Sequence, residues 1–233
     1  MKGHFVEIQN FRELIFAFFL FLIIILNSLP AAFSKIFPMT KRDIAELLTR
    51  DFFEDFAMQC AKIIKAEGAE ETLFELLCDL VGRDKGRLAL LGLYKSAEVN
   101  RAEFRAAYVF EYTYLSDPEF LEKRIEEFAA LFPQVKGESA KRHFSKIMAH
   151  LLGRIDNDKY HNQLEVVAAS CVDWVINQKV RVAVVVWAVE CLLTLKARYE
   201  WLPEILDEIL DNLTENPTAG MKVRLKKWKF YRH

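Results

Sequence analysis

Proline and glycine are scarce in this chain, and their scarcity limits what the chain can be. Six prolines and eight glycines are spread over 233 residues, so no stretch has the composition of a disordered linker or a low-complexity tract. The chain is 52% hydrophobic and 28% charged, which is enough apolar material for a substantial core. We therefore expect one folded body, as a single domain or as one short repeat array.

Signatures of catalysis and of metal binding are also missing from the sequence. It contains no glycine-rich phosphate loop, no Gly-x-Ser-x-Gly elbow and no His-Glu-x-x-His pair. His143 and His150 share a helix face but lie two turns apart, about 10 Å along the axis, which is too far for one ion. We expect both histidines at the surface or at an interface. We expect no catalytic residue, no cofactor and no metal ion, and the pattern favours a protein that is not an enzyme.

The cysteines and the net charge exclude two further classes. None of the four cysteines belongs to a C-x-x-C pair, and all four fall in apolar stretches, which favours small buried side chains in a reducing compartment. A net charge of -1 gives no electrostatic reason for broad nucleic-acid binding, which usually needs a strongly basic face. Nucleic acid therefore stays possible as a partner but is disfavoured.

Residues 1–38 differ from the rest of the chain. Residues 14–26 carry no polar side-chain atom, but this run of 13 is shorter than the roughly 18 to 20 residues that span a bilayer. Three interpretations stay open: a start assigned upstream of a true start at Met39, a signal or membrane anchor, and a packed first helix. With Met39 as the start we expect a cytoplasmic protein; with the segment present in the mature chain we expect a membrane-anchored or exported one.

From residue 39 to residue 233 the apolar pattern is helical throughout. We expect a first long helix that ends near Gly68 and places Ile44, Phe52 and Ile63 on one face. The later stretches pair into helical hairpins, about five in all, over residues 40–81, 84–115, 118–152, 159–196 and 201–230. In the last helix Met221, Leu225 and Trp228 should point inward, with lysines outward.

One stretch conflicts with this pattern. The run from Val180 to Val189 is rich in β-branched residues, which alone would favour a strand. The apolar run continues to Leu195, however, which is too long for an ordinary strand. We therefore predict a helix that is apolar nearly all round and lies in the middle of a stack.

Four arginines recur along the helical part at nearly even spacing. Arg105, Arg142, Arg181 and Arg224 are separated by 37 (105 to 142), 39 (142 to 181) and 43 (181 to 224) residues. Each lies near the start of an apolar stretch that opens the second helix of a predicted hairpin. A period of this length is typical of stacked helical hairpins, in which each unit buries its apolar face against its neighbours.

At these residues the chain resembles HEAT-repeat and related armadillo-like α-solenoids. Lys179-Val180-Arg181-Val182-Ala183 matches the family's second-helix opening well, and Lys222-Val223-Arg224 matches it in part. Arg105 and Arg142 lack the preceding valine, so those units are degenerate. The resemblance covers residues 84–230, and residues 40–81 more weakly. It implies an all-α, right-handed superhelix, in which the four arginines are structural and pair with acidic groups in the turns; the candidates are Glu98, Glu138, Asp173 and Glu215.

The resemblance also implies a binding function. We expect a non-enzymatic module or scaffold that holds a protein or peptide in the groove of the second helices. A patch near the C-terminus could meet an anionic partner; it comprises Lys222, Lys226, Lys227, Lys229 and Arg232. HEAT-like alkylpurine DNA glycosylases give an alternative, because they use an aromatic and acidic cleft, for which Asp173 and Trp174 are the weak candidates. A membrane-tethered or exported solenoid is the third alternative. The sequence does not indicate an oligomeric state.

Overall fold

The computed structural model describes residues 38–177, 180–215 and 217–228. The chain divides into two compact units, Met1–Pro38 and Met39–His233, and the description below concerns the second by itself. The apolar run at residues 14–26 lies outside the described residues, as do Lys179, Lys229 and Arg232.

Within the described residues all regular structure is helical, as the sequence pattern predicts. The α-helices are α2 (Lys41–Thr49), α3 (Phe56–Ala66), α4 (Glu70–Gly82), α5 (Lys85–Leu90), α6 (Ser96–Ser116), α7 (Pro118–Glu122), α8 (Ile125–Leu131), α9 (Glu138–Leu151), α10 (His161–Ile176), α11 (Val182–Leu195), α12 (Leu202–Glu215) and α13 (Ala219–Trp228). Two short 3-10 helices, η2 (Phe132–Gln134) and η3 (Lys196–Arg198), follow α8 and α11.

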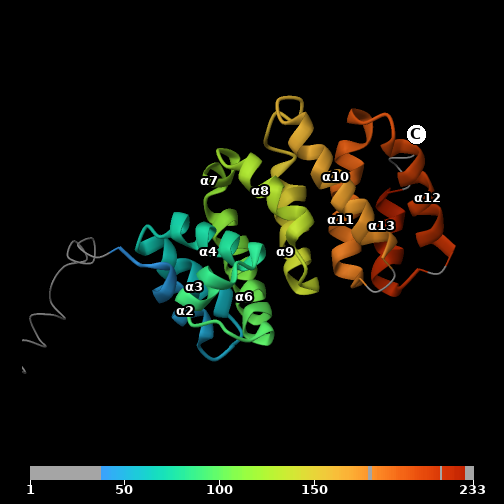
Figure 1. Cartoon of the computed structure of the whole chain (residues 1–233). Coiled ribbons are helices and arrows are strands. Elements are labelled where there is room, and N and C mark those ends of the chain that lie inside the picture. Colours follow the sequence, from blue (N-terminus) through green and yellow to red (C-terminus); the bar gives the residue numbers. More distant parts are fainter. Residues whose placement is uncertain (1–37, 178–179, 216, 229–233) are drawn as a thin grey trace, which may run out of the picture. The chain divides into compact units, whose positions relative to one another are not determined.

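Two sets of helices run through the unit. The second helices are α3, α6, α9, α11 and α13, and each packs on the next one in that order (Figure 1). The first helices are α4, α7, α8, α10 and α12; α4 packs on α6, α7 on α9, α10 on α11 and α12 on α13, while α2 and α5 belong to neither set. The pairing of α4 with α6 differs from the predicted hairpins over residues 40–81 and 84–115, which place α4 in the first hairpin and α5 in the second. These contacts bury the apolar sides of α4, α7, α10 and α12 against the second helices, and α8 contributes Phe128, whose ring stacks on Phe144 of α9.

Aromatic rings fill the space between the two sets over the middle of the unit. Phe110 of α6 stacks on Phe74 of α4 at 5.5 Å between ring centroids, and Phe144 of α9 stacks on Phe128 of α8 at 5.0 Å. Phe132 of η2 stacks on Trp174 of α10 at 5.3 Å. All except Trp174 are at most 1% exposed, and Trp174 is 6% exposed. Stacked rings at these distances add specific geometry to the burial of apolar area.

The predicted first long helix is wrong, because the structure breaks it into α2 and α3. Arg50 leaves the helical region with a ψ of 163° and ends α2. Phe52 then lies in the connection, 52% exposed, instead of on an apolar helix face. The break is stabilised by a side chain from another part of the chain, since Arg105 of α6 donates hydrogen bonds to the carbonyl oxygens of Leu48 and Arg50.

The valine-rich stretch is a helix, which confirms the prediction against its strand propensity. α11 begins at Val182 and ends at Leu195, and Val184, Val189 and Leu192 are completely buried. It packs against α9, α10, α12 and α13, so apolar residues are needed on several of its sides. In α13 the inward side chains are Met221, Leu225 and Trp228, as predicted.

Candidate functional site

A continuous series of aromatic and charged side chains crosses the second helices, and we call it the belt. Neighbouring members touch one another by hydrogen bonds, ion pairs or ring contacts from α3 to α13. Its members are Phe52, Phe56, Phe104, Arg105, Tyr108, Glu111, His143, Lys146, Trp187, Glu190, Arg224, Lys227 and Trp228.

The belt begins at Arg105. Its Nη1 lies 2.6 Å from the carbonyl oxygen of Leu48 and 2.8 Å from that of Arg50. The last carbonyls of a helix have no partner within the helix and carry partial negative charge, so a guanidinium group satisfies them well. The same guanidinium group lies over the rings of Phe52 and Phe56, with centroid distances of 5.5 Å and 5.3 Å.

A buried carboxylate holds the middle of the belt. Glu111 of α6 accepts a hydrogen bond from Nδ1 of His143 at 2.7 Å and another from Nζ of Lys146 at 2.5 Å. His143 and Lys146 are three residues apart on α9, so both reach the same side of that helix. Burial raises the pKa of Glu111, but the hydrogen bonds and charges of His143 and Lys146 outweigh burial, and the pKa lies below its usual value. The carboxylate is therefore held ionised as an anchor between α6 and α9.

Both histidines were expected at the surface or at an interface, and for His143 a surface position is wrong, since the residue is 2% exposed. Its ring stacks on that of Tyr108, 4.8 Å between centroids, and lies 5.8 Å from that of Phe104. His150, by contrast, is exposed, as expected, and lies 5.8 Å from the ring of Trp187. The pairing of His143 with Glu111 joins residues 32 positions apart, and no local pattern in the sequence marks it.

Glu190 of α11 is the anchor at the C-terminal end of the belt. It accepts hydrogen bonds from Nη1 of Arg224 at 3.2 Å, from Nζ of Lys227 at 3.1 Å and from Nε1 of Trp228 at 3.1 Å. All three donors come from α13. Hydrogen bonds to an ionised carboxylate are strong, and three of them come from α13, so Glu190 holds α13 against α11.

Trp187 connects the two anchors. Nζ of Lys146 lies 5.8 Å from the centroid of the Trp187 ring, and the guanidinium carbon of Arg224 lies 5.4 Å from it. The two cations come from α9 and α13, on either side of α11 in the helix order. Because Trp187 is partly exposed, its ring and these cations are accessible from solvent. The position of Trp187 one turn before Glu190 is visible in the sequence, whereas its cationic neighbours from α9 and α13 are not.

The four repeat arginines have different surroundings. Arg105 and Arg224 belong to the belt, whereas Arg142 is exposed and Arg181 precedes α11 as its N-cap residue, with Nη1 3.4 Å from the hydroxyl of Ser139. The expected acidic partners are wrong within the described residues. Among the four expected carboxylates, Glu98 pairs with Lys95 and Glu138 with Lys141, while Asp173 and Glu215 are exposed.

Asp173 and Trp174 do not share a cleft. The Trp174 ring is buried against Phe132 and has Nζ of Lys141 at 5.7 Å from its centroid. Asp173 is exposed and lines a separate hollow of about 520 Å³ with Trp201, which donates from Nε1 to Glu165 at 3.1 Å. Neighbours on a helix point about 100° apart, which explains the separation.

The predicted anionic-partner patch is only partly within the described residues. Lys222 and Lys226 are exposed, and Lys227 is engaged by Glu190. Lys229 and Arg232 lie outside the described part of the chain. The described patch therefore offers three exposed lysines on α13, of which Lys227 is already paired with Glu190.

Two observations on the described residues concern metal binding and thiol chemistry. These residues contain no group of three or more histidine, cysteine or acidic side chains arranged to hold a metal ion. Burial raises the pKa of the Cys191 thiol well above its usual value, so this cysteine is a poor nucleophile. Over the same residues, no helix combines the length and the apolarity needed to cross a bilayer.

Comparison with known proteins adds no relative: no family model, no curated protein and no solved structure matches the chain.

Proposed function

We propose that this protein is a non-enzymatic binding module, and that the belt on its second helices holds a segment of a partner protein. The observation that carries the proposal is Trp187, a partly exposed residue whose ring has one cation from α9 and one from α13 within 5.8 Å of its centroid. Half-buried aromatic and arginine side chains on a fixed support supply most of the binding energy at protein interfaces. The carboxylates of Glu111, which is buried, and Glu190, which is half-buried, fix the cations in place, so the surface needs little ordering on binding.

The arrangement of the helices supports a HEAT-like solenoid as the scaffold for this surface. In such a scaffold each hairpin contacts its neighbours, and the second helices together line one face. The consecutive packing of α6 on α9, α9 on α11 and α11 on α13 fits that arrangement. We propose a right-handed superhelix for Met39–His233, and an experimental structure with the opposite hand would overturn that part.

A protein segment suits the belt better than a nucleic acid does. Phosphate binding needs cations that exchange their counterions for phosphates. Lys146 is paired with Glu111, Arg224 and Lys227 are paired with Glu190, and Arg105 is bound to two carbonyl oxygens. Cations engaged in this way are weak phosphate ligands, but their apolar stems and the adjacent rings still form a contact surface.

Selection from a displayed library of random peptides tests the proposal. The immobilised full chain should enrich a family of peptides, and Trp187→Ala should lower their binding at least about tenfold, as expected for a central anchor. Trp201→Ala is the matched control, because Trp201 is also partly exposed but lies beside η3 and contacts α10, away from the belt.

Two results would overturn the proposal. One is a selection in which no peptide family is enriched on the native chain, or in which Trp201→Ala and Trp187→Ala weaken binding equally. The other is tight binding of a 30-base-pair duplex, on the order of 1 µM, that weakens steeply as salt rises, because this would point to a nucleic-acid function instead.

A further inference from the structure

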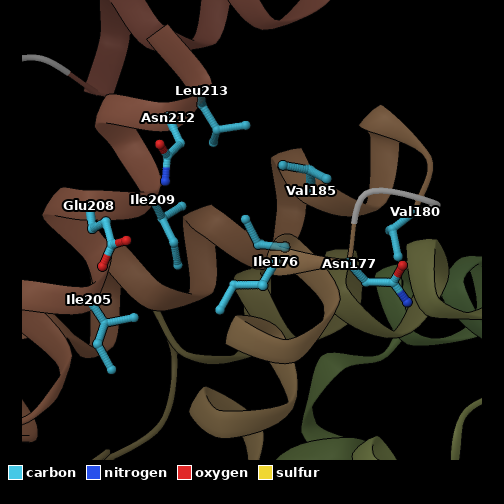
Figure 2. A pocket seen from close by; sticks show the side chains of 10 residues that line it. Ile176, Asn177, Val180, Val185, Ile205, Glu208, Ile209, Asn212 and Leu213 are labelled. Atoms are coloured by element: carbon cyan, nitrogen blue, oxygen red, sulfur yellow. The ribbon is translucent and has the colours of Figure 1, made fainter. Parts of the chain in front are cut away.

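An apolar groove lies on the other set of helices, away from the belt. It has a volume of about 530 Å³ and lies between the end of α10, the start of α11 and the length of α12. Figure 2 shows Ile205, Ile209 and Leu213 of α12 along one wall and Ile176 of α10 facing them. The three α12 residues recur every four positions and so form a ridge about 12 Å long. Ile176 is 61% exposed, so the groove opens to solvent along this side.

The two helices that flank the groove carry charges of one sign. α12 contains five aspartates and glutamates, and neither helix has lysine or arginine within its bounds; the two acids of α10, Glu165 and Asp173, line the separate hollow beside Trp201. Glu208 lies in the groove wall, and Glu204 is exposed one turn before it on α12. Asp207, on the same helix, is paired with Lys196 of η3. An apolar floor with an acidic rim is a complement for a ligand that is apolar on one side and basic on the other.

We propose that this groove binds a cationic amphipathic helix of a partner protein. The ridge at i, i+4 and i+8 of α12 matches the repeat at which such a helix presents its apolar anchors, and 12 Å corresponds to about two helical turns. Lysine or arginine beside those anchors meets Glu208 and Glu204 at the rim. The site goes beyond the proposed function of the belt, because it uses α10 and α12 and a partner of different chemistry.

The described part of this chain does not offer such a helix to a second copy. Its most basic helix is α13, with Lys222, Lys226 and Lys227. The apolar side of α13 is already buried within its own fold, since Met221 is 3% exposed and Trp228 is 1% exposed. A second copy would therefore have to unfold α13 to place that helix in the groove, and for this reason the proposal commits to a helix of a different protein.

Fluorescence anisotropy of the full chain with designed peptides tests the site. The probe is a labelled peptide of about 18 residues, roughly 27 Å as a helix, with leucine on one face and lysine elsewhere. A second peptide keeps the leucines and replaces every lysine by glutamate. We expect the lysine peptide to bind at least about tenfold more tightly than the glutamate peptide.

Two variants with matched controls place the peptide in the groove. Ile176→Ser should weaken the lysine peptide about fivefold or more, whereas Val166→Ser, at an exposed valine on the same helix outside the groove, should change binding less than about twofold. Glu208→Lys should weaken it about fivefold, whereas Glu126→Lys, the same charge change on α8, should again have an effect of less than about twofold. Equal effects of variant and control would overturn the proposal, because binding would then be general attraction to acidic helices.

Three other outcomes would also count against it. Equal affinity for the lysine and glutamate peptides would remove the role of the acidic rim. Absence of binding to either peptide at about 1 mM would remove the site. Dimerisation of the chain in sedimentation velocity that Ile176→Ser abolishes would show a second copy in the groove. None of these outcomes depends on the peptide selection at Trp187, so the belt and the groove can fail separately.

Discussion

The first helices and the second helices differ in how they use carboxylates. α4, α7, α8, α10 and α12 contain fifteen aspartates and glutamates and no lysine or arginine. α3, α6, α9, α11 and α13 contain eleven lysines and arginines and only five acidic residues. Among these five, Glu103 and Glu111 are buried and Glu190 is half-buried, and each has a cationic partner. A net charge of -1 for the whole chain hides this separation.

The comparison shows that one residue type has two roles in this fold. On the second helices Glu103, Glu111 and Glu190 are buried or half-buried and pair with residues of other segments, as Glu111 connects α6 to α9. On the first helices most carboxylates face solvent, with Asp79 of α4 as an exception that is buried between Lys41 and Arg87. Replacing an acidic residue should therefore change the free energy of unfolding much more on the second helices than on the first.

The largest effect is expected for Glu111→Ala. It leaves His143 and Lys146 without their carboxylate partner in a buried setting, which should lower the free energy of unfolding by about 3 kcal/mol. Glu126→Ala, at an exposed position of α8, should change it by less than about 0.5 kcal/mol. Urea unfolding followed by circular dichroism measures both. Similar losses for the two variants would remove the distinction between the two sets of helices.

The positions of most helices follow from the sequence, because they depend on local apolar periodicity and end signals. The helix at Val182–Leu195 was predictable despite its β-branched composition, because the apolar run is too long for an ordinary strand. The break after α2 was not, because the group that satisfies its last carbonyl oxygens is Arg105, more than 50 residues away. Periodicity reports which face of a helix is apolar and gives no information on distant hydrogen-bond donors.

The belt was less predictable than the fold. The even spacing of the four arginines was visible in the sequence, but their partners depend on how far each helix is shifted along its neighbour. Arg224 donates a hydrogen bond to Glu190 because α13 packs along α11 in a position that brings these two residues together. The expected partner Glu215 remains exposed. Likewise, the burial of His143 depends on Glu111, 32 residues earlier on the adjacent helix.

A smaller effect on stability than that of Glu111→Ala is expected when pH is lowered. The pKa of Glu111 is below its usual value in the folded state, so the folded state binds its proton less readily than the unfolded state. The stabilisation is therefore present above the unfolded pKa near 4.5 and is lost as pH falls through the lower folded value. Between pH 6 and pH 3.5 the melting temperature should fall, and Glu111→Gln should show a shallower fall, by about 3 °C.

Glu103 provides the opposite control on the same helix. Burial raises its pKa despite Arg83 nearby, so its protonation favours the folded state and adds stability as pH falls. Glu103→Gln should then give a steeper fall in melting temperature than the native chain. A shallower fall in both variants would contradict the assignment of opposite roles to these two glutamates.

The smallest change in stability should come from a substitution on the acidic first helices, and it should be an increase. On α12, Glu208 has Glu204 four residues before it and Asp211 three residues after it, and like charges at these spacings destabilise a helix by about 0.2–0.5 kcal/mol per pair. Glu208→Lys converts both pairs into pairs of opposite charge, so we expect about 0.5 kcal/mol of added stability in urea at low salt. The gain should shrink when 1 M NaCl reduces the Debye length to about 3 Å. The same substitution should weaken binding of the lysine peptide in the groove. A variant that is more stable and yet binds the peptide less tightly would therefore show that the loss of binding is not caused by a loss of folding. A loss of stability at low salt would instead show that the acids of α12 do not repel one another.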